Sequence, residues 1–318
     1  MSTEEPLVGR LAPSPTGLIH LGHARTFLLA WWSVRSRGGR VVLRIEDLDG
    51  DRCSPEMVDA AKRDLEWLGL DWDGAARLQS TGIERMAAEL AELEARGLVY
   101  PCVCTRGEVR QAQSAPQAGD AEPRYPGTCR GRFASREHAA QRSGRTPSLR
   151  FIVPEGPVTV RDELRGEVVF DVAASVGDFV VARRDGAPAY QLAVVSDDAY
   201  DGVTEVLRGD DLLPSAARQR LLQRALALPS PAYVHLPLVL DETGRRLAKR
   251  ERDLGLYDLA SAGADPRAVV AWAAQSAGMR VPDRLTAREA TAAFARDRLP
   301  REPVRLDRVT LEHLRQAR

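Results

Sequence analysis

The 318-residue chain is poor in cysteine and lysine and has no long apolar run. Its four cysteines are too few to suggest a disulfide scaffold in a chain of this length. Its apolar stretches are short and interrupted, so we expect no membrane-spanning helix and no membrane partner. The opening residues MSTEEPLVGR lack a basic segment followed by an apolar core, so we expect no secretory signal. These absences favour a soluble, cytoplasmic protein.

An excess of charge of one sign is also lacking, because 45 basic residues balance 45 acidic ones. A neutral chain has no overall field that draws it onto nucleic acid, so any RNA contact must come from a local patch. Only two of the basic residues are lysines, Lys62 and Lys249. The length is sufficient for about two domains with a sizeable core.

Strand-like and helix-like segments alternate in both halves of the chain, which predicts an α/β fold. Residues 7–12, 24–37 and 40–45 have the pattern of a strand, a helix and a strand, which is typical of a parallel crossover unit. Further strands are predicted at 178–183, 203–207 and 233–240, and further helices at 189–197, 214–227 and 267–275.

Two helix starts carry capping signals. The Ser-Pro pair at 54–55 predicts the start of a helix that stops at Gly69. Thr81 with Glu84 predicts a capping box for another helix, which ends at Gly97.

The order of these segments predicts how the chain is divided. We expect residues 1–100 to form the first half of a Rossmann-type, doubly wound parallel sheet and residues 176–253 its second half. Residues 101–175 break the alternation and are expected to form an insertion. Residues 254–318, rich in Ala and Arg at helical spacing, are expected to form a short helical region.

The segment from Arg10 to Thr26, R-L-A-P-S-P-T-G-L-I-H-L-G-H-A-R-T, leaves a predicted strand and opens a helix. A helix N-terminus exposes backbone N–H groups and partial positive charge, which suit phosphate. His20 and His23 add donors that can follow charge developing on a reacting phosphate. Gly22 lets a flat ring such as adenine approach the backbone. The segment therefore predicts a nucleotide site, although two histidines on one helix face also suit a plain polar patch.

A basic loop follows the last predicted strand and contains Lys249 within G-R-R-L-A-K-R. A mobile ammonium there can neutralise a pyrophosphate leaving group. Taken alone, the loop is better explained as a solvated basic turn.

Three charged residues fall at the predicted carboxyl ends of strands, namely Arg10, Glu46 and Arg208. Open α/β sheets bind ligands at that edge, and arginine suits carboxylate recognition. Two cations and one anion match glutamate, which has two carboxylates and one ammonium. Tyr190 could add a hydroxyl. Taken singly, each residue suits an ordinary surface or salt-bridge role.

Cysteines cluster in the expected insertion, at Cys102, Cys104 and Cys129, whereas Cys53 stands alone. Three thiols close in sequence in a reducing compartment favour zinc, which takes four N, S or O ligands. His138 is a candidate for the fourth ligand by residue type. Three free buried cysteines remain the alternative.

Together these motifs resemble class I aminoacyl-tRNA synthetases of the glutamyl branch over about residues 7–260. The A-P-S-P-T-G run differs from the P-P-E-P-N-G-like run of the glutaminyl branch. The resemblance implies that His20, His23 and Lys249 are catalytic and that these three residues and Gly22 bind ATP with Mg²⁺. The loop at 246–250 resembles a K-M-S-K-S signature, from which Arg246 and Ala248 depart. The implied glutamate-binding residues are Arg10, Leu11, Ala12, Pro13, Ser14, Glu46, Tyr190 and Arg208.

The pattern C-x-C followed by Y-x-x-x-C resembles the zinc site of glutamyl-Q tRNA(Asp) synthetases, which implies Zn²⁺ on Cys102, Cys104, Tyr125 and Cys129 and ranks Tyr125 above His138. From about Leu254 the chain is too short for a large anticodon-binding domain. The resemblance implies a monomeric ligase that activates L-glutamate with ATP and transfers it to queuosine in the anticodon of tRNA(Asp), with the insertion contacting the acceptor. A truncated glutamyl-tRNA synthetase that charges a tRNA 3′ end, and a non-catalytic relic that binds tRNA or glutamate, remain alternatives.

Overall fold

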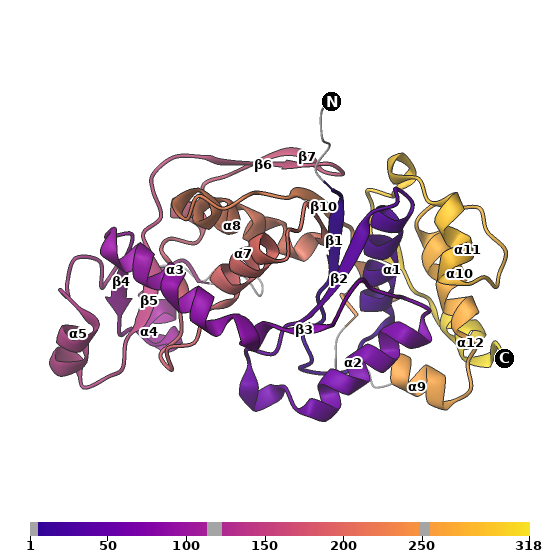
Figure 1. Cartoon of the computed structure of the whole chain (residues 1–318), viewed down its shortest axis with the longest axis horizontal. Coiled ribbons are helices and arrows are strands. Elements are labelled where there is room, and N and C mark those ends of the chain that lie inside the picture. Colours follow the sequence, from indigo (N-terminus) through magenta and orange to yellow (C-terminus); the bar gives the residue numbers. More distant parts are fainter. Residues whose placement is uncertain (1–5, 113–122, 248–254) are drawn as a thin grey trace.

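The computed structural model describes residues 6–112, 123–247 and 255–318. Two sheets with parallel strands lie at its centre (Figure 1). The first has the order β1-β2-β3, with β1 at Val8–Leu11, β2 at Arg40–Ile45 and β3 at Arg77–Leu78. The second has the order β7-β6-β10-β9, with β6 at Val158–Asp162, β7 at Gly166–Phe170, β9 at Glu205–Gly209 and β10 at Ala232–Leu236. The sheets meet at β1 and β9, where the Thr204 N–H donates to the Val8 carbonyl at 2.9 Å.

Helices cover both faces of this central layer, because successive side chains of β2 point into two different cores that contain helices. Val41 and Leu43 belong to a core with α1 (Leu21–Arg35) and α10 (Pro266–Ser276), whereas Val42 packs on the opposite core. That second core contains side chains of α3 (Ile83–Ala95), α7 (Tyr190–Tyr200) and α8 (Leu213–Ala225).

The C-terminal helices form an outer layer over α1 (Figure 1). Buried Arg25 of α1 ties this layer down, since it donates to the Ser276 hydroxyl at 2.8 Å and to the Pro237 carbonyl at 3.2 Å. The remaining helices around this part are α2 (Pro55–Trp67), α9 (Leu256–Ser261), α11 (Ala287–Ala290) and α12 (Arg308–Gln316). Every helix within the described residues falls short of the length and apolar character that a bilayer crossing requires.

A third, antiparallel sheet lies to one side of the molecule in the order β4-β5-β8 (Figure 1). Its strands are β4 (Val99–Cys102), β5 (Ser148–Phe151) and β8 (Phe179–Ala182), accompanied by α4 (Arg106–Gln111), α5 (Arg136–Ser143) and α6 (Val172–Ser175). A small separate core forms around β4 and the cysteines. The β6–β7 hairpin also comes from the 101–175 segment, yet β6 pairs with β10 of the central layer.

The structure confirms the predicted α/β class with parallel strands, and β2 matches its prediction residue for residue. Ser54 caps α2 by accepting the Met57 N–H at 3.4 Å, as predicted. The division into domains stays a prediction.

Two local predictions were wrong. Thr81 does not cap α3, because it lies inside a 3₁₀ turn (Gln79–Gly82) and its hydroxyl donates back to the Leu78 carbonyl at 2.6 Å. The predicted strand at 233–240 is broken after Leu236, because Pro237 has no N–H for the ladder. Its last residues form β11 (Val239–Leu240), which pairs with β12 (Val304–Arg305) instead.

Candidate active site

A cavity of about 370 Å³ lies at the carboxyl ends of β1 and β9, where the two sheets meet. In a parallel sheet this junction is the usual place for a ligand. Among the residues predicted from sequence, the following line the cavity: Arg10, Ala12, Pro13, Ser14, His20, Gly22, His23, Glu46, Tyr190 and Arg208. Leu11 is fully buried in the core beneath it and is not among the lining residues. Lys249 and Ala248 lie outside the described residues.

The two histidines lie at the start of α1 and stack with ring centroids 3.7 Å apart. His20 is the N-cap, and its Nδ1 accepts the backbone N–H groups of Gly22 at 3.1 Å and of His23 at 3.4 Å. Because Nδ1 accepts, the proton of a neutral His20 sits on Nε2, which becomes a donor. A methyl group at position 22 would lie 3.0 Å from the His20 ring, so the ring would have to shift by a few tenths of an ångström to keep this cap.

Two buried arginines form the cationic wall of the cavity. Arg10 lies near the end of β1. Its guanidinium donates to the Leu207 carbonyl at 3.2 Å and lies 3.7 Å from the Asp198 carboxylate. Burial lowers the pKa of Arg10, and Asp198 opposes that shift. Arg208 is 5% exposed, and its Nη1 has no hydrogen-bond partner among the described residues. An orphaned guanidinium donor in a buried site indicates a place for an anion.

Glu46 supplies the anionic wall. Its backbone N–H donates to the Pro13 carbonyl at 2.9 Å, which ties the end of β2 to the signature segment. Its carboxylate accepts the Ser14 hydroxyl at 3.1 Å and Arg44 Nη2 at 3.3 Å. Strands β1 and β9 and the residue after β2 therefore bring two arginines and one carboxylate to the cavity.

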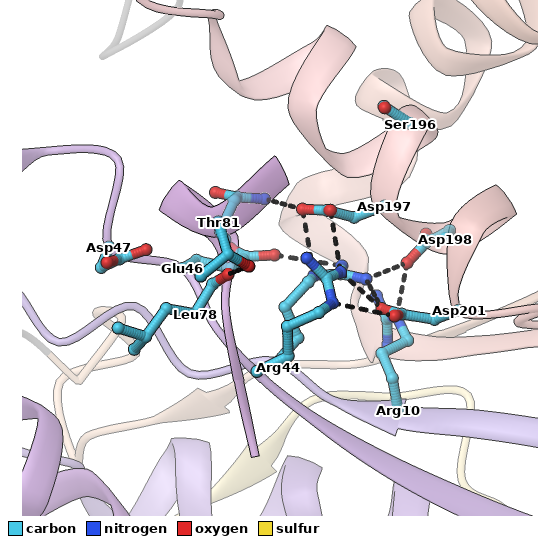
Figure 2. A network of polar contacts seen from close by, with 12 residues as sticks. Arg10, Arg44, Glu46, Asp47, Leu78, Thr81, Ser196, Asp197, Asp198 and Asp201 are labelled. Atoms are coloured by element: carbon cyan, nitrogen blue, oxygen red, sulfur yellow. Dashed lines mark hydrogen bonds and ion pairs between the residues drawn. The ribbon is translucent and has the colours of Figure 1, made fainter. Parts of the chain in front are cut away.

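A buried ion-pair network beneath the cavity orients these walls (Figure 2). Arg44 of β2 is fully buried and donates to Asp198 of α7 at 2.7 Å and to Asp201, the C-cap of that helix, at 3.3 Å. Burial would lower the pKa of Arg44, but Asp198, Glu46 and Asp197 together raise it. Sequence reasoning missed Arg44 and Asp198 as site residues, although the R-I-E-D run and the acidic pair in α7 were the available signals.

The loop after β11 reaches the same cavity. Arg246 and Leu247 line it, and Arg246 Nη2 lies 2.7 Å from Asp211. Arg246, which stands where the signature has lysine, thus still provides a cation. It is paired with Asp211, which also lines the cavity.

The three clustered cysteines lie together beside β4, with their sulfur atoms all within 4.8 Å of one another. Tyr125 completes the group, because its hydroxyl lies 3.3 Å from Cys102 Sγ and 3.9 Å from Cys104 Sγ. Zinc–sulfur bonds of about 2.3 Å in a tetrahedron put the ligand atoms about 3.8 Å apart, so these donors fit zinc. Among the described residues, His138 and Cys53 are not part of this cluster. His138 Nδ1 accepts the Ala134 N–H at 3.1 Å instead.

Arg150 of β5 is a further neighbour of the cysteines that the sequence did not indicate. Its Nε donates to Cys102 Sγ at 3.3 Å, and its guanidinium lies 3.7 Å from the centre of the Tyr125 ring. A donor on a thiolate sulfur and a positive charge nearby both stabilise an anionic ligand set.

Comparisons with known proteins identify the family of the chain. A family model described as tRNA synthetases class I (E and Q), catalytic domain, matches residues 6–311. The chain is similar to a glutamyl-Q tRNA(Asp) synthetase of Symbiobacterium thermophilum, with 46% identity over 97% of this chain and 98% of the relative. A second relative of that name, from Nitratidesulfovibrio vulgaris, is 45% identical over 86% of this chain and 87% of its own length.

A solved glutamate-tRNA synthetase from Elizabethkingia anophelis has a similar fold, with a TM-score of 0.82 at 24% identity. The match spans 98% of this chain and 70% of that structure.

Proposed function

The chain belongs to the class I tRNA synthetases (E and Q) and to the glutamyl-Q tRNA(Asp) synthetases among them, and we propose that it activates L-glutamate with ATP and transfers it to queuosine in tRNA(Asp). The observation that carries the glutamate assignment is the cavity lined by Arg10, Arg208 and Glu46. Two carboxylates would bind the arginines, and the ammonium would bind Glu46. Ala12, Pro13, Ser14 and Tyr190 would complete the pocket.

The first step joins glutamate to AMP. A glutamate α-carboxylate oxygen attacks the α-phosphorus of ATP, the bond to the bridging oxygen breaks, and pyrophosphate leaves. The Nε2 donor of His20 and the neighbouring His23 would stabilise charge on the phosphate oxygens, with Lys249 neutralising the pyrophosphate. Class I synthetases use ATP with Mg²⁺, which would supply further charge neutralisation.

The second step transfers the acyl group. A hydroxyl of the queuosine cyclopentenediol attacks the acyl carbon, the acyl–phosphate bond breaks, and AMP leaves. The names of the relatives support this acceptor.

The remaining assignments are architectural. We infer a doubly wound Rossmann-type sheet that is interrupted by a zinc-bearing insertion and followed by a short helical region. Cys102, Cys104, Tyr125 and Cys129 would hold the zinc, which supplies a closed structural cross-link rather than catalysis.

Glutamate-dependent ATP–pyrophosphate exchange tests the first step. We expect exchange with L-glutamate and a loss of about 10²-fold or more in Lys249→Ala. Lys62→Ala is the matched control, because Lys62 is the other lysine of the chain, lies in α2 and is not among the residues lining the cavity. Wild-type protein without exchange would refute the assignment and favour a non-catalytic relic.

Charging tests the second step. Glutamate should be attached to tRNA(Asp) that contains queuosine and not to queuosine-free tRNA(Asp). Periodate cleavage of the charged RNA would locate the ester. Glutamate on a tRNA 3′ end would instead establish the truncated glutamyl-tRNA synthetase alternative.

A further inference from the structure

Arg208 is held by a buried residue of a neighbouring strand, His235, which is itself held by buried Asp162 of a third strand; neither residue lines the cavity. His235 of β10 is the register partner of Arg208 in β9. Arg208 Nε donates to His235 Nε2 at 3.0 Å, and His235 Nδ1 lies 2.6 Å from Asp162 Oδ2 at the end of β6. The imidazole is fully buried, and the carboxylate and guanidinium are at least 95% buried.

The hydrogen bonds to Asp162 determine the tautomer of His235. Asp162 Oδ1 accepts the backbone N–H groups of Leu164 at 3.0 Å and of Arg165 at 2.7 Å, and Oδ2 accepts the backbone N–H of His235 at 3.0 Å. Burial would raise the pKa of Asp162, but the His235 and backbone hydrogen bonds lower it, so the group is a carboxylate that only accepts. His235 Nδ1 must therefore carry the proton, which leaves the Nε2 lone pair facing Arg208.

The imidazole is also kept neutral. Burial lowers the pKa of His235, and the nearby Arg208 and Arg10 cations lower it further, against the effect of Asp162. A protonated ring would place an N–H donor against the Arg208 N–H and two cations side by side.

The consequence for Arg208 is a fixed orientation. Nε is bound to His235, and Nη2 donates to Gln219 Oε1 at 2.8 Å. The guanidinium plane is held on two of its nitrogens, and Nη1 is the one without a hydrogen-bond partner among the described residues.

We propose that His235 and Asp162 are positioning residues for glutamate binding: Asp162 holds His235 as a neutral acceptor, and His235 aims Arg208 at a substrate carboxylate. The inference rests on the proposed function, since it takes glutamate as the ligand of Arg208.

Two amide variants separate positioning from general stability. His235→Asn retains an amide that can donate to Asp162 but has no atom at the Nε2 position. His235→Gln can place a carbonyl oxygen there and accept from Arg208. In the exchange assay we expect His235→Asn to raise the KM for glutamate about tenfold or more, as for a lost hydrogen bond to a charged group. The KM for ATP should stay within about twofold, and His235→Gln should recover most of the glutamate affinity. Equal KM changes for both substrates, or equal effects of both variants, would overturn the proposal.

The tautomer is measured on the wild-type protein and needs no activity. Long-range ¹H–¹⁵N correlation spectra of the histidine rings, assigned with His235→Gln, should show protonated Nδ1 and unprotonated Nε2. A proton on Nε2 would overturn the inference even in an active enzyme. Absence of glutamate-dependent exchange would instead refute the proposed function and its substrate. The tautomer would still decide how Arg208, His235 and Asp162 are hydrogen-bonded.

Discussion

Replacing Arg44 by Met tests whether the ion-pair network beneath the cavity acts as one unit. Arg44 is fully buried and meets four carboxylates, at 2.7 Å from Asp198, 3.3 Å from Asp201, 3.3 Å from Glu46 and 3.8 Å from Asp197. Methionine keeps most of the volume but removes the charge and every donor. The acids would then face each other without the central cation.

The cost follows from what remains buried. Removing one partner of a buried ion pair costs about 3–5 kcal/mol, which is a large share of the roughly 5–15 kcal/mol that stabilise a domain. The effect should also reach the cavity, because Asp198 lies against Arg10 and Glu46 loses its link to Arg44. We therefore expect a raised KM for glutamate in addition to lower stability.

Urea unfolding and glutamate-dependent exchange measure the two effects in the same protein. Arg44→Lys keeps the charge without the planar fork and should fall between wild type and Arg44→Met in both assays. Arg52→Met is the matched control on an exposed arginine whose ion-pair partner is Asp49, and it should change neither quantity. A loss below about 1 kcal/mol in Arg44→Met would refute the idea of a charge-compensated unit.

Three further predictions concern stability and metal. Burial raises the pKa of Asp64 to about 6, helped by Asp258 and opposed by a backbone hydrogen bond from Ile19. Since this folded-state pKa exceeds the unfolded value, the free energy of unfolding falls as pH rises from the ordinary value of 3.8 through about 6. Asp64→Asn should therefore raise the free energy of unfolding at pH 7.5 by at most about 3 kcal/mol, which is measured as a higher Tm, and should have little effect at pH 4. An equal Tm shift at both pH values would contradict this cause. Tyr125→Phe should lower bound zinc in metal analysis after dialysis against a weak chelator, and unchanged binding would exclude the hydroxyl as a ligand. Ser54→Ala should cost about 1 kcal/mol in chemical denaturation, whereas Thr81→Ala should cost less than half of that; the reverse order would contradict the observed caps.

Much of the cavity was accessible from sequence because its parts are short segments with strong local signals. The run that carries His20, Gly22 and His23 forms one helix start, so its geometry follows from residues a few positions apart. Ser14 and Pro13 come with it on the same loop. The roles of these residues in catalysis stay predictions until exchange is measured.

Local signals failed where a competing contact was stronger. Thr81 has the residue type and spacing of a cap, yet its hydroxyl finds the Leu78 carbonyl within a tighter turn. The apolar run at 233–240 looks like one strand, but Pro237 ends the ladder and its carbonyl accepts from Arg25 of a distant helix. The first competing partner is only three residues away in the chain, whereas the second lies 212 residues away and is visible only after the chain has folded.

The sequence by itself determined the chemistry available at each position: the capped helix start, the parallel strand–helix–strand unit and the thiol and phenol groups that could ligate zinc. Only the tertiary structure decided which charges meet. Asp162, Arg208 and His235 come from three separate strands, and Arg44 reaches acids on α7. Strand order and burial bring these groups together and remove the water that would otherwise screen them, so their partners and their protonation states are properties of the fold.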